Sequence, residues 1–212
     1  WEPRESLDWE PVVNGHYDSE VRMEWRRTDQ THICLAVPGL SLNDPDRYNL
    51  TILNVILGDG MSSRLFQSLR EVQGLAYDVS SSNSHFRDCG ALTVYCGVEP
   101  KKSRLAVQGI VHELQGMHQE APEQEITKAR EYTKGRLLLR MEDTRAVSGW
   151  LASQELLQGE VATPEEVVQR LDEVNSEDVA RVAERLLQPE QIRLAVVGPH
   201  RSEARFLKLL QF

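Results

Sequence analysis

Two hydrophobic periods follow one another along this chain in an order that few folds can accommodate. Alternating apolar and polar residues, typical of strands, come early, while the three-to-four-residue spacing of helices dominates the second half. Strand-like alternation returns once, near the end. Early strands and late helices predict an α+β fold, with helices packed on one face of a largely antiparallel sheet.

The strands are expected in five short segments, each bounded by turn residues. These segments are residues 21–25, 32–37, 75–84, 91–98 and 192–197. The turn at residues 28–30 connects the first two, so we expect them to form a hairpin.

Helices are predicted between and after these strands, several with clear start and stop signals. They fall at about residues 46–57, 63–73, 107–117, 126–141 and 145–157, and after Thr163 and Asn175. Ser62 or Ser63 is expected to cap the second helix, and Gly74 to end it. Thr163-Pro164-Glu165-Glu166 has the form of a capping box, with threonine as N-cap and glutamate three residues later.

Length and composition predict one ordinary folded domain. The 212 residues divide into a lead-in at residues 1–19, read as a linker or strap, and a single domain at residues 20–212. The net charge of −9 argues against a nucleic-acid partner, because phosphate binding needs a basic surface. No apolar run approaches the ~20 residues of a membrane-spanning helix. The chain begins at Trp1 without a signal-like segment, which we interpret as a fragment or a processed product.

The three cysteines, Cys34, Cys89 and Cys96, form no C-x-x-C pair. Their odd number and low density make a disulfide framework improbable and favour a reducing compartment such as the cytoplasm. Cys34 lies within an apolar strand, where free cysteine commonly packs as a small hydrophobic residue. No base that could activate it is evident in the sequence.

Metal-binding patterns are weak. His112 and His118 are six residues apart, which places them about 120° apart around a regular helix, so they cannot share one ion. His85, Cys89 and Cys96 would form a site only if a hairpin brought them together, and their spacing is not that of known ligand sets. The glycine-rich residues 58–63 match neither a P-loop nor a dinucleotide fingerprint, and a helix-to-helix turn explains them better.

Residues 58–77, GDGMSSRLFQSLREVQGLAY, resemble a known family. They are similar to the pitrilysin and insulin-degrading enzyme family of inverted zinc peptidases, which includes mitochondrial processing peptidase. The resemblance continues through residues 141–160, 163–187 and 192–199. It implies homologous α+β units of about this length that pair around a chamber, one of which carries H-x-x-E-H on its first long helix.

The helix that matches in this sequence, residues 46–57, contains no histidine or glutamate, and H-x-x-E-H occurs nowhere in the chain. The resemblance therefore implies the non-catalytic unit, which binds no metal and pairs with a catalytic domain or subunit that holds zinc. In such units an arginine and a tyrosine seven residues later reach across to substrate, and Arg70 and Tyr77 match this spacing. Arg70 would bind peptide carbonyls, and the Tyr77 hydroxyl would donate to an oxyanion.

Three functions follow as hypotheses. The first is the non-catalytic half of a zinc endopeptidase, inactive alone and partnered by an H-x-x-E-H domain and a peptide substrate. The second is a structural assembly subunit like the core proteins of the respiratory bc1 complex. The third is a peptide-binding module without a catalytic partner. Ordinary structural roles also exist, since Arg70 would suit the last turn of a helix and Tyr77 the start of a strand.

Overall fold

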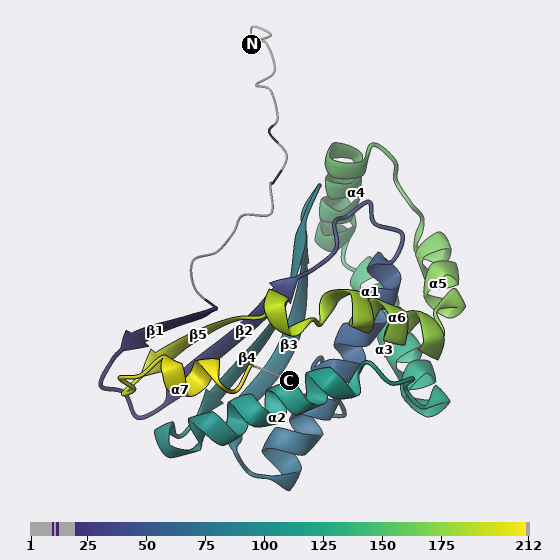
Figure 1. Cartoon of the computed structure of the whole chain (residues 1–212). Helices are drawn as coiled ribbons and strands as arrows, with labels where there is room; N and C mark the ends of the chain where they lie inside the picture. Colours follow the sequence, from purple (N-terminus) through teal and green to yellow (C-terminus); the bar gives the residue numbers. More distant parts are fainter. Residues whose placement is uncertain (1–9, 11, 13–19, 211–212) are drawn as a thin grey trace, which may run out of the picture.

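The computed structural model describes residue 10, residue 12 and residues 20–210. Its centre is one five-stranded sheet with the strand order β1-β5-β2-β4-β3 (Figure 1). The strands are β1 (Val21–Trp25), β2 (Thr31–Pro38), β3 (Ala76–His85), β4 (Gly90–Val98) and β5 (Arg193–Gly198). Apart from residues 10 and 12, the predicted linker at residues 1–19 lies outside the described part of the chain.

The predicted hairpin between the first two strands is wrong. β5 lies between them, parallel to β1 with Val21 opposite Leu194, and antiparallel to β2 with Ile33 opposite Val196. Local signals at the turn identify two strands and a reversal of direction, but they cannot show that a strand 150 residues later inserts between them. The remaining pairs, β2 with β4 and β4 with β3, are antiparallel.

The predicted helices have nearly the expected bounds, whereas the last helix, at residues 204–207, was not predicted. The helices are α1 (Arg47–Leu57), η1 (Phe66–Val72), α2 (Ser103–Gly116), α3 (Glu123–Met141), α4 (Thr144–Gln158), α5 (Pro164–Glu173), α6 (Ser176–Leu186) and α7 (Ala204–Leu207), with short 3-10 turns η2 (Pro100–Lys102) and η3 (Pro189–Gln191). The capping box is confirmed, because the Thr163 side chain accepts from the Glu166 N–H while the Glu166 carboxylate accepts from the Thr163 N–H. No helix in the described ranges is both long and apolar enough to cross a membrane.

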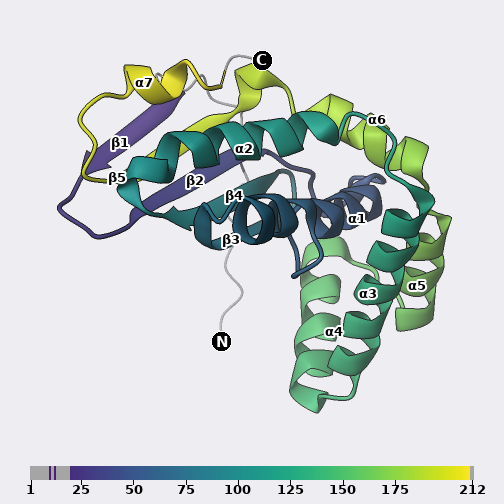
Figure 2. The ribbon, with the colours of Figure 1, turned by 90° about the horizontal axis from the view of Figure 1, so that it is seen from below.

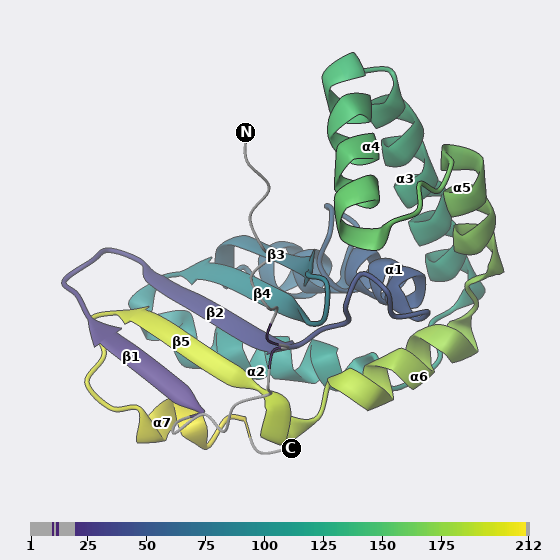
Figure 3. The same ribbon diagram turned by 90° about the horizontal axis from the view of Figure 1, so that it is seen from above.

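One face of the sheet forms the core. Along β2, the side chains of Ile33, Leu35 and Val37 are buried. The side chain of His32, between the buried Thr31 and Ile33, is exposed. Figure 2 shows α2 and η1 covering the core face, and Figure 3 shows the opposite face without a helix in front of it. The predicted α+β architecture with helices on one face is thus confirmed. α3, α4 and α5 extend past one end of the sheet, so α3 contributes only its first half, with Ile126 and Ala129, to the core.

Candidate functional site

The segment that runs from the end of α1 into the first residues of β3 contains both predicted site residues, and its helix has an unusual form. η1 is a π-helix, and Arg70 lies in its last turn. The expected serine cap is absent: the Ser63 hydroxyl donates to the Gly60 carbonyl, 2.7 Å away, and caps no helical N–H. Short π segments are rare and are often found at functional sites, because they displace side chains from regular helical positions.

The connection from η1 to β3 is held by backbone geometry. Gly74 has a φ of 58°, the left-handed conformation of a helix C-cap. The Leu75 N–H reaches back to the Leu69 carbonyl at 2.7 Å, and both leucine side chains are buried. The Lys102 ammonium donates to the Gly74 carbonyl at 3.0 Å. The helix therefore leads into β3 through a short connection whose direction is fixed at three points.

Tyr77 lies at a β-bulge. The register passes from Ala76 opposite Val98 to Asp78 opposite Gly97, so Tyr77 is an extra residue in β3. Ala76 and Val79 are buried, whereas Tyr77 and Asp78 between them are both exposed. A bulge changes the direction of a side chain in this way, and bulges are common next to active sites. Tyr77 is 58% exposed, so it does not pack in the core.

Arg70 and Tyr77 both present unused hydrogen-bond donors. The Arg70 guanidinium lies over the Phe66 ring, 4.9 Å from its centroid, and forms no ion pair or hydrogen bond with any described residue. The Tyr77 hydroxyl likewise has no partner in the described part of the chain. The structure places the two residues at opposite ends of the rigid connection, and no direct contact joins them.

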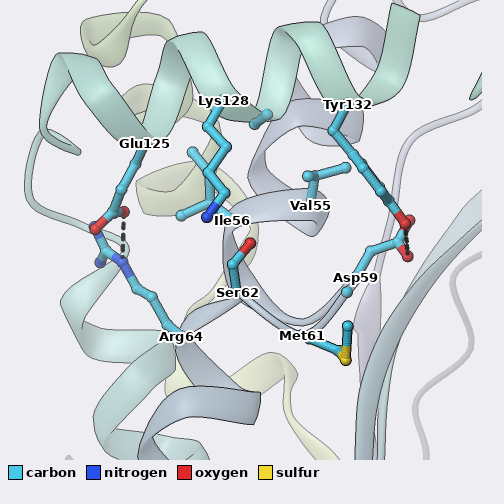
Figure 4. A pocket seen from close by; sticks show the side chains of 11 residues that line it. Val55, Ile56, Asp59, Met61, Ser62, Arg64, Glu125, Lys128 and Tyr132 are labelled. Carbon is cyan, nitrogen blue, oxygen red and sulfur yellow. Dashed lines mark hydrogen bonds and ion pairs between the residues drawn. The ribbon is translucent and has the colours of Figure 1, made fainter. Parts of the chain in front are cut away.

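A cavity of about 340 Å³ lies beside this segment, where the turn after α1 faces α3 (Figure 4). Its lining residues are Val55, Ile56, Asp59, Gly60, Met61, Ser62, Arg64, Glu125, Lys128, Ala129 and Tyr132. Arg64 bonds Glu125 at 2.8 Å on one side, and on the other Asp59 lies 3.5 Å from the Tyr132 hydroxyl. The space between is apolar and suits a hydrocarbon side chain, but neither Arg70 nor Tyr77 lines it.

This cavity was not predicted. Residues 58–63 form the turn expected between two helices, yet the opposite wall comes from α3, about 65 residues later. No local pattern in the sequence pairs these two segments.

The histidines and cysteines that were considered as weak metal-site alternatives are not brought together. Among the described residues, no three histidine, cysteine, aspartate or glutamate side chains gather closely enough to hold an ion. His85 bonds the Leu40 carbonyl at one end of β3, whereas Cys96 is buried on the core face of β4, where burial raises the pKa of its thiol to about 12. His112 is exposed on α2, and His118 lies beyond the end of that helix.

The resemblance equates helix α1 with the helix that carries the zinc ligands in catalytic units, and α1 contains no histidine, cysteine, aspartate or glutamate. Its buried polar side chain, Asn54, bonds the Ser81 hydroxyl at 2.7 Å, and Asn83 donates to the Leu50 carbonyl at 3.0 Å. These bonds attach α1 to β3.

Residues 6–132, more than half of the chain, match the family model of the peptidase M16 inactive domain. The chain belongs to this family. The resemblance drawn from residues 58–77 is therefore confirmed. The M16 inactive domain also accounts for an α1 without metal ligands.

Curated relatives of this M16 domain are zinc proteases. An uncharacterized zinc protease of Streptomyces coelicolor is 37% identical over 180 residues, which cover 84% of this chain and 39% of that protein. The uncharacterized zinc protease YmxG of Bacillus subtilis is 35% identical over 86% of this chain and 45% of its own length. The chain thus spans less than half the length of these relatives.

The fold also occurs in a respiratory complex. A chain of complex III from Candida albicans superimposes with a TM-score of 0.79 at 19% identity, over 90% of this chain and 49% of that one. At this level of identity the similarity concerns the fold alone.

Proposed function

We propose that this M16 domain is the non-catalytic half of a zinc-dependent endopeptidase. Zinc would be held by an H-x-x-E-H domain or subunit that pairs with it, since α1 offers no ligands. Arg70 would bind a carbonyl of the peptide substrate. The Tyr77 hydroxyl would donate to the oxyanion that develops on the scissile carbonyl.

The observation that carries the proposal is the pair of unused donors at the two ends of a fixed helix-to-strand connection. Arg70 projects from a π-helix and Tyr77 from a bulge, and both are exposed. An oxyanion donor is effective only when its direction is set before the reaction. The Gly74 cap and the Leu75–Leu69 hydrogen bond set the direction of this connection.

The ordinary structural roles of these residues receive little support. In η1 the Ser68 carbonyl accepts from the Gln73 N–H and the Leu69 carbonyl from the Leu75 N–H, and Arg70 donates to no carbonyl of the described residues. Tyr77 is too exposed to act as a core aromatic residue. Free donors on both side chains are better explained by a ligand than by folding.

A structural assembly role is the second candidate, because the same fold occurs in a chain of complex III. A subunit of that kind needs no exposed arginine and tyrosine at this connection. Mutagenesis of the pair therefore separates the two candidates.

The test uses the chain combined with an H-x-x-E-H partner half and a fluorogenic peptide. We expect Tyr77→Phe to lower kcat at least about tenfold with little change in KM, because one oxyanion donor contributes ~3 kcal/mol. We expect Arg70→Ala chiefly to raise KM, since a ground-state contact to a carbonyl contributes on the order of 1 kcal/mol.

Two control variants make the same chemical changes elsewhere. Tyr95→Phe removes a hydroxyl from β4 that bonds the His32 ring, and Arg145→Ala removes an exposed cation from α4. Both should retain activity, and all four variants should unfold at the temperature of the unmodified chain. Full activity in both Arg70→Ala and Tyr77→Phe would reject the proposed roles and favour assembly.

A further inference from the structure

A second cavity, of about 460 Å³, is lined by residues at the start of α2 and in the segment that connects the end of β5 to α7. Its lining residues are Pro100, Lys101, Ser103, Arg104, Pro199, His200, Arg201, Ser202, Arg205 and Phe206. Four of them are cations that come from two segments about 100 residues apart. No aspartate or glutamate among the described residues lines the cavity.

These cations lack acidic partners. Lys101, Arg104 and Arg205 form no ion pair or hydrogen bond with the described residues, and Arg201 contacts only the Trp25 ring, at 5.9 Å. The acidic residue that immediately precedes α7, Glu203, accepts a hydrogen bond from the Met23 N–H instead. Other arginines of this chain do form ion pairs, as where Arg181 and Arg185 both bond Asp46.

The walls of the cavity are rigid. The His200 ring bonds the Thr31 hydroxyl at 2.8 Å and meets the Phe206 ring edge-on at 5.3 Å. Ser103 and Phe206 are 1% and 2% exposed. Burial lowers the pKa of His200, so this ring is neutral at pH 7 and serves as a wall. The charge of the cavity therefore comes from lysine and arginine.

The arrangement is unfavourable for the empty protein. Like charges repel one another, and cations at the start of a helix oppose its dipole. The chain as a whole carries a net charge of −9, so general basicity does not explain the cluster. An anion in the cavity would relieve both penalties, and three guanidinium groups offer paired donors that match phosphate or carboxylate oxygens.

We propose that this cavity binds a small anion with more than one phosphate or carboxylate group. The limited volume of the cavity, and the four cations that line it, suit a compact ligand better than an extended acidic polymer. The site is independent of Arg70 and Tyr77, neither of which lines it.

The test is titration of the purified chain at low ionic strength with pyrophosphate and, separately, citrate, followed by calorimetry and thermal unfolding. Low salt is needed because exposed charges are screened at high salt. We expect saturating pyrophosphate to raise Tm by at least about 3 °C. The double variant Arg104→Gln/Arg205→Gln should bind at least about tenfold more weakly. The titration with citrate shows whether carboxylate groups can bind in place of phosphate groups.

The double variant Arg140→Gln/Arg145→Gln is the matched control, since it removes two exposed cations from α3 and α4. It should bind pyrophosphate like the unmodified chain. Equal binding by both double variants would show a general charge effect and overturn the proposal. Binding of poly-glutamate without binding of pyrophosphate or citrate would also overturn the proposal, because it would indicate a surface for an acidic protein instead. Circular dichroism confirms that each variant is folded.

Discussion

Gly74 determines how the chain turns between the two candidate substrate-binding residues. Its φ of 58° belongs to a region that costs other L-residues about 1 kcal/mol or more. A Cβ built at this position would meet no atom within 4 Å. A substitution here therefore tests the backbone conformation alone, without a steric clash.

We expect Gly74→Ala to lower the free energy of unfolding by about 1 kcal/mol. Gly135→Ala is the matched control, because a Cβ there also meets nothing within 4 Å but Gly135 lies inside α3 with no positive φ. It should stabilise the chain by about 0.5–1 kcal/mol, since alanine favours helix. Urea unfolding measures both effects, and stabilisation by both variants would contradict the left-handed cap.

At the scale of elements, Asp46 joins α1 to α6. Its carboxylate accepts from Arg181 at 2.8 and 2.9 Å and from Arg185 at 3.2 Å, and the Asp46 side chain is only 13% exposed. The hydrogen bonds from Arg181 hold the pKa of Asp46 below its usual value, against the opposing effect of burial. Because Asp46 immediately precedes α1, this contact fixes the start of that helix against α6.

The sign of the pH dependence follows from the lowered pKa. The unfolded chain binds the proton more readily, so Asp46 contributes stability above its unfolded pKa of 3.8, and this is lost as the pH falls through the folded value. Asp46→Asn should therefore cost about 1 kcal/mol near pH 7 and progressively less below pH ~4.

Unfolding measured from pH 7 to pH 3 tests this, with Asp29→Asn as the control. Asp29 lies in the turn before β2 and forms no ion pair with the described residues. A cost of Asp46→Asn that stays constant down to pH 3 would show that the ionised carboxylate is not the source of the stability.

At the scale of the whole molecule, the chain has the architecture of an M16 unit without that family's metal ligands. We expect the purified chain, after mild chelation of loosely bound metal, to contain far less than one zinc per molecule. A partner half with H-x-x-E-H should contain about one under the same treatment. Elemental analysis measures the zinc content of both proteins. About one zinc per molecule of the isolated chain would contradict the conclusion that α1 holds no metal ligands.

Most elements could be predicted because their signals are local. Period, caps and turn residues identified the strands and nearly all helix bounds, and the Thr163 cap forms as expected. The prediction was less accurate for the segment that connects α1 to β3. Residues 63–73 were expected to form a capped α-helix, yet η1 is a π-helix without a serine cap.

The sequence by itself determined which residues form strands and helices, the family, and the lack of H-x-x-E-H, because each depends on residue type and spacing along the chain. Only the tertiary structure decided that β5 separates β1 from β2, and that a bulge exposes Tyr77. Only the tertiary structure also shows that Lys101 and Arg104 line the same cavity as Arg201 and Arg205. Pairing and convergence of this kind depend on which distant surfaces bury one another, and no short segment of sequence contains that information.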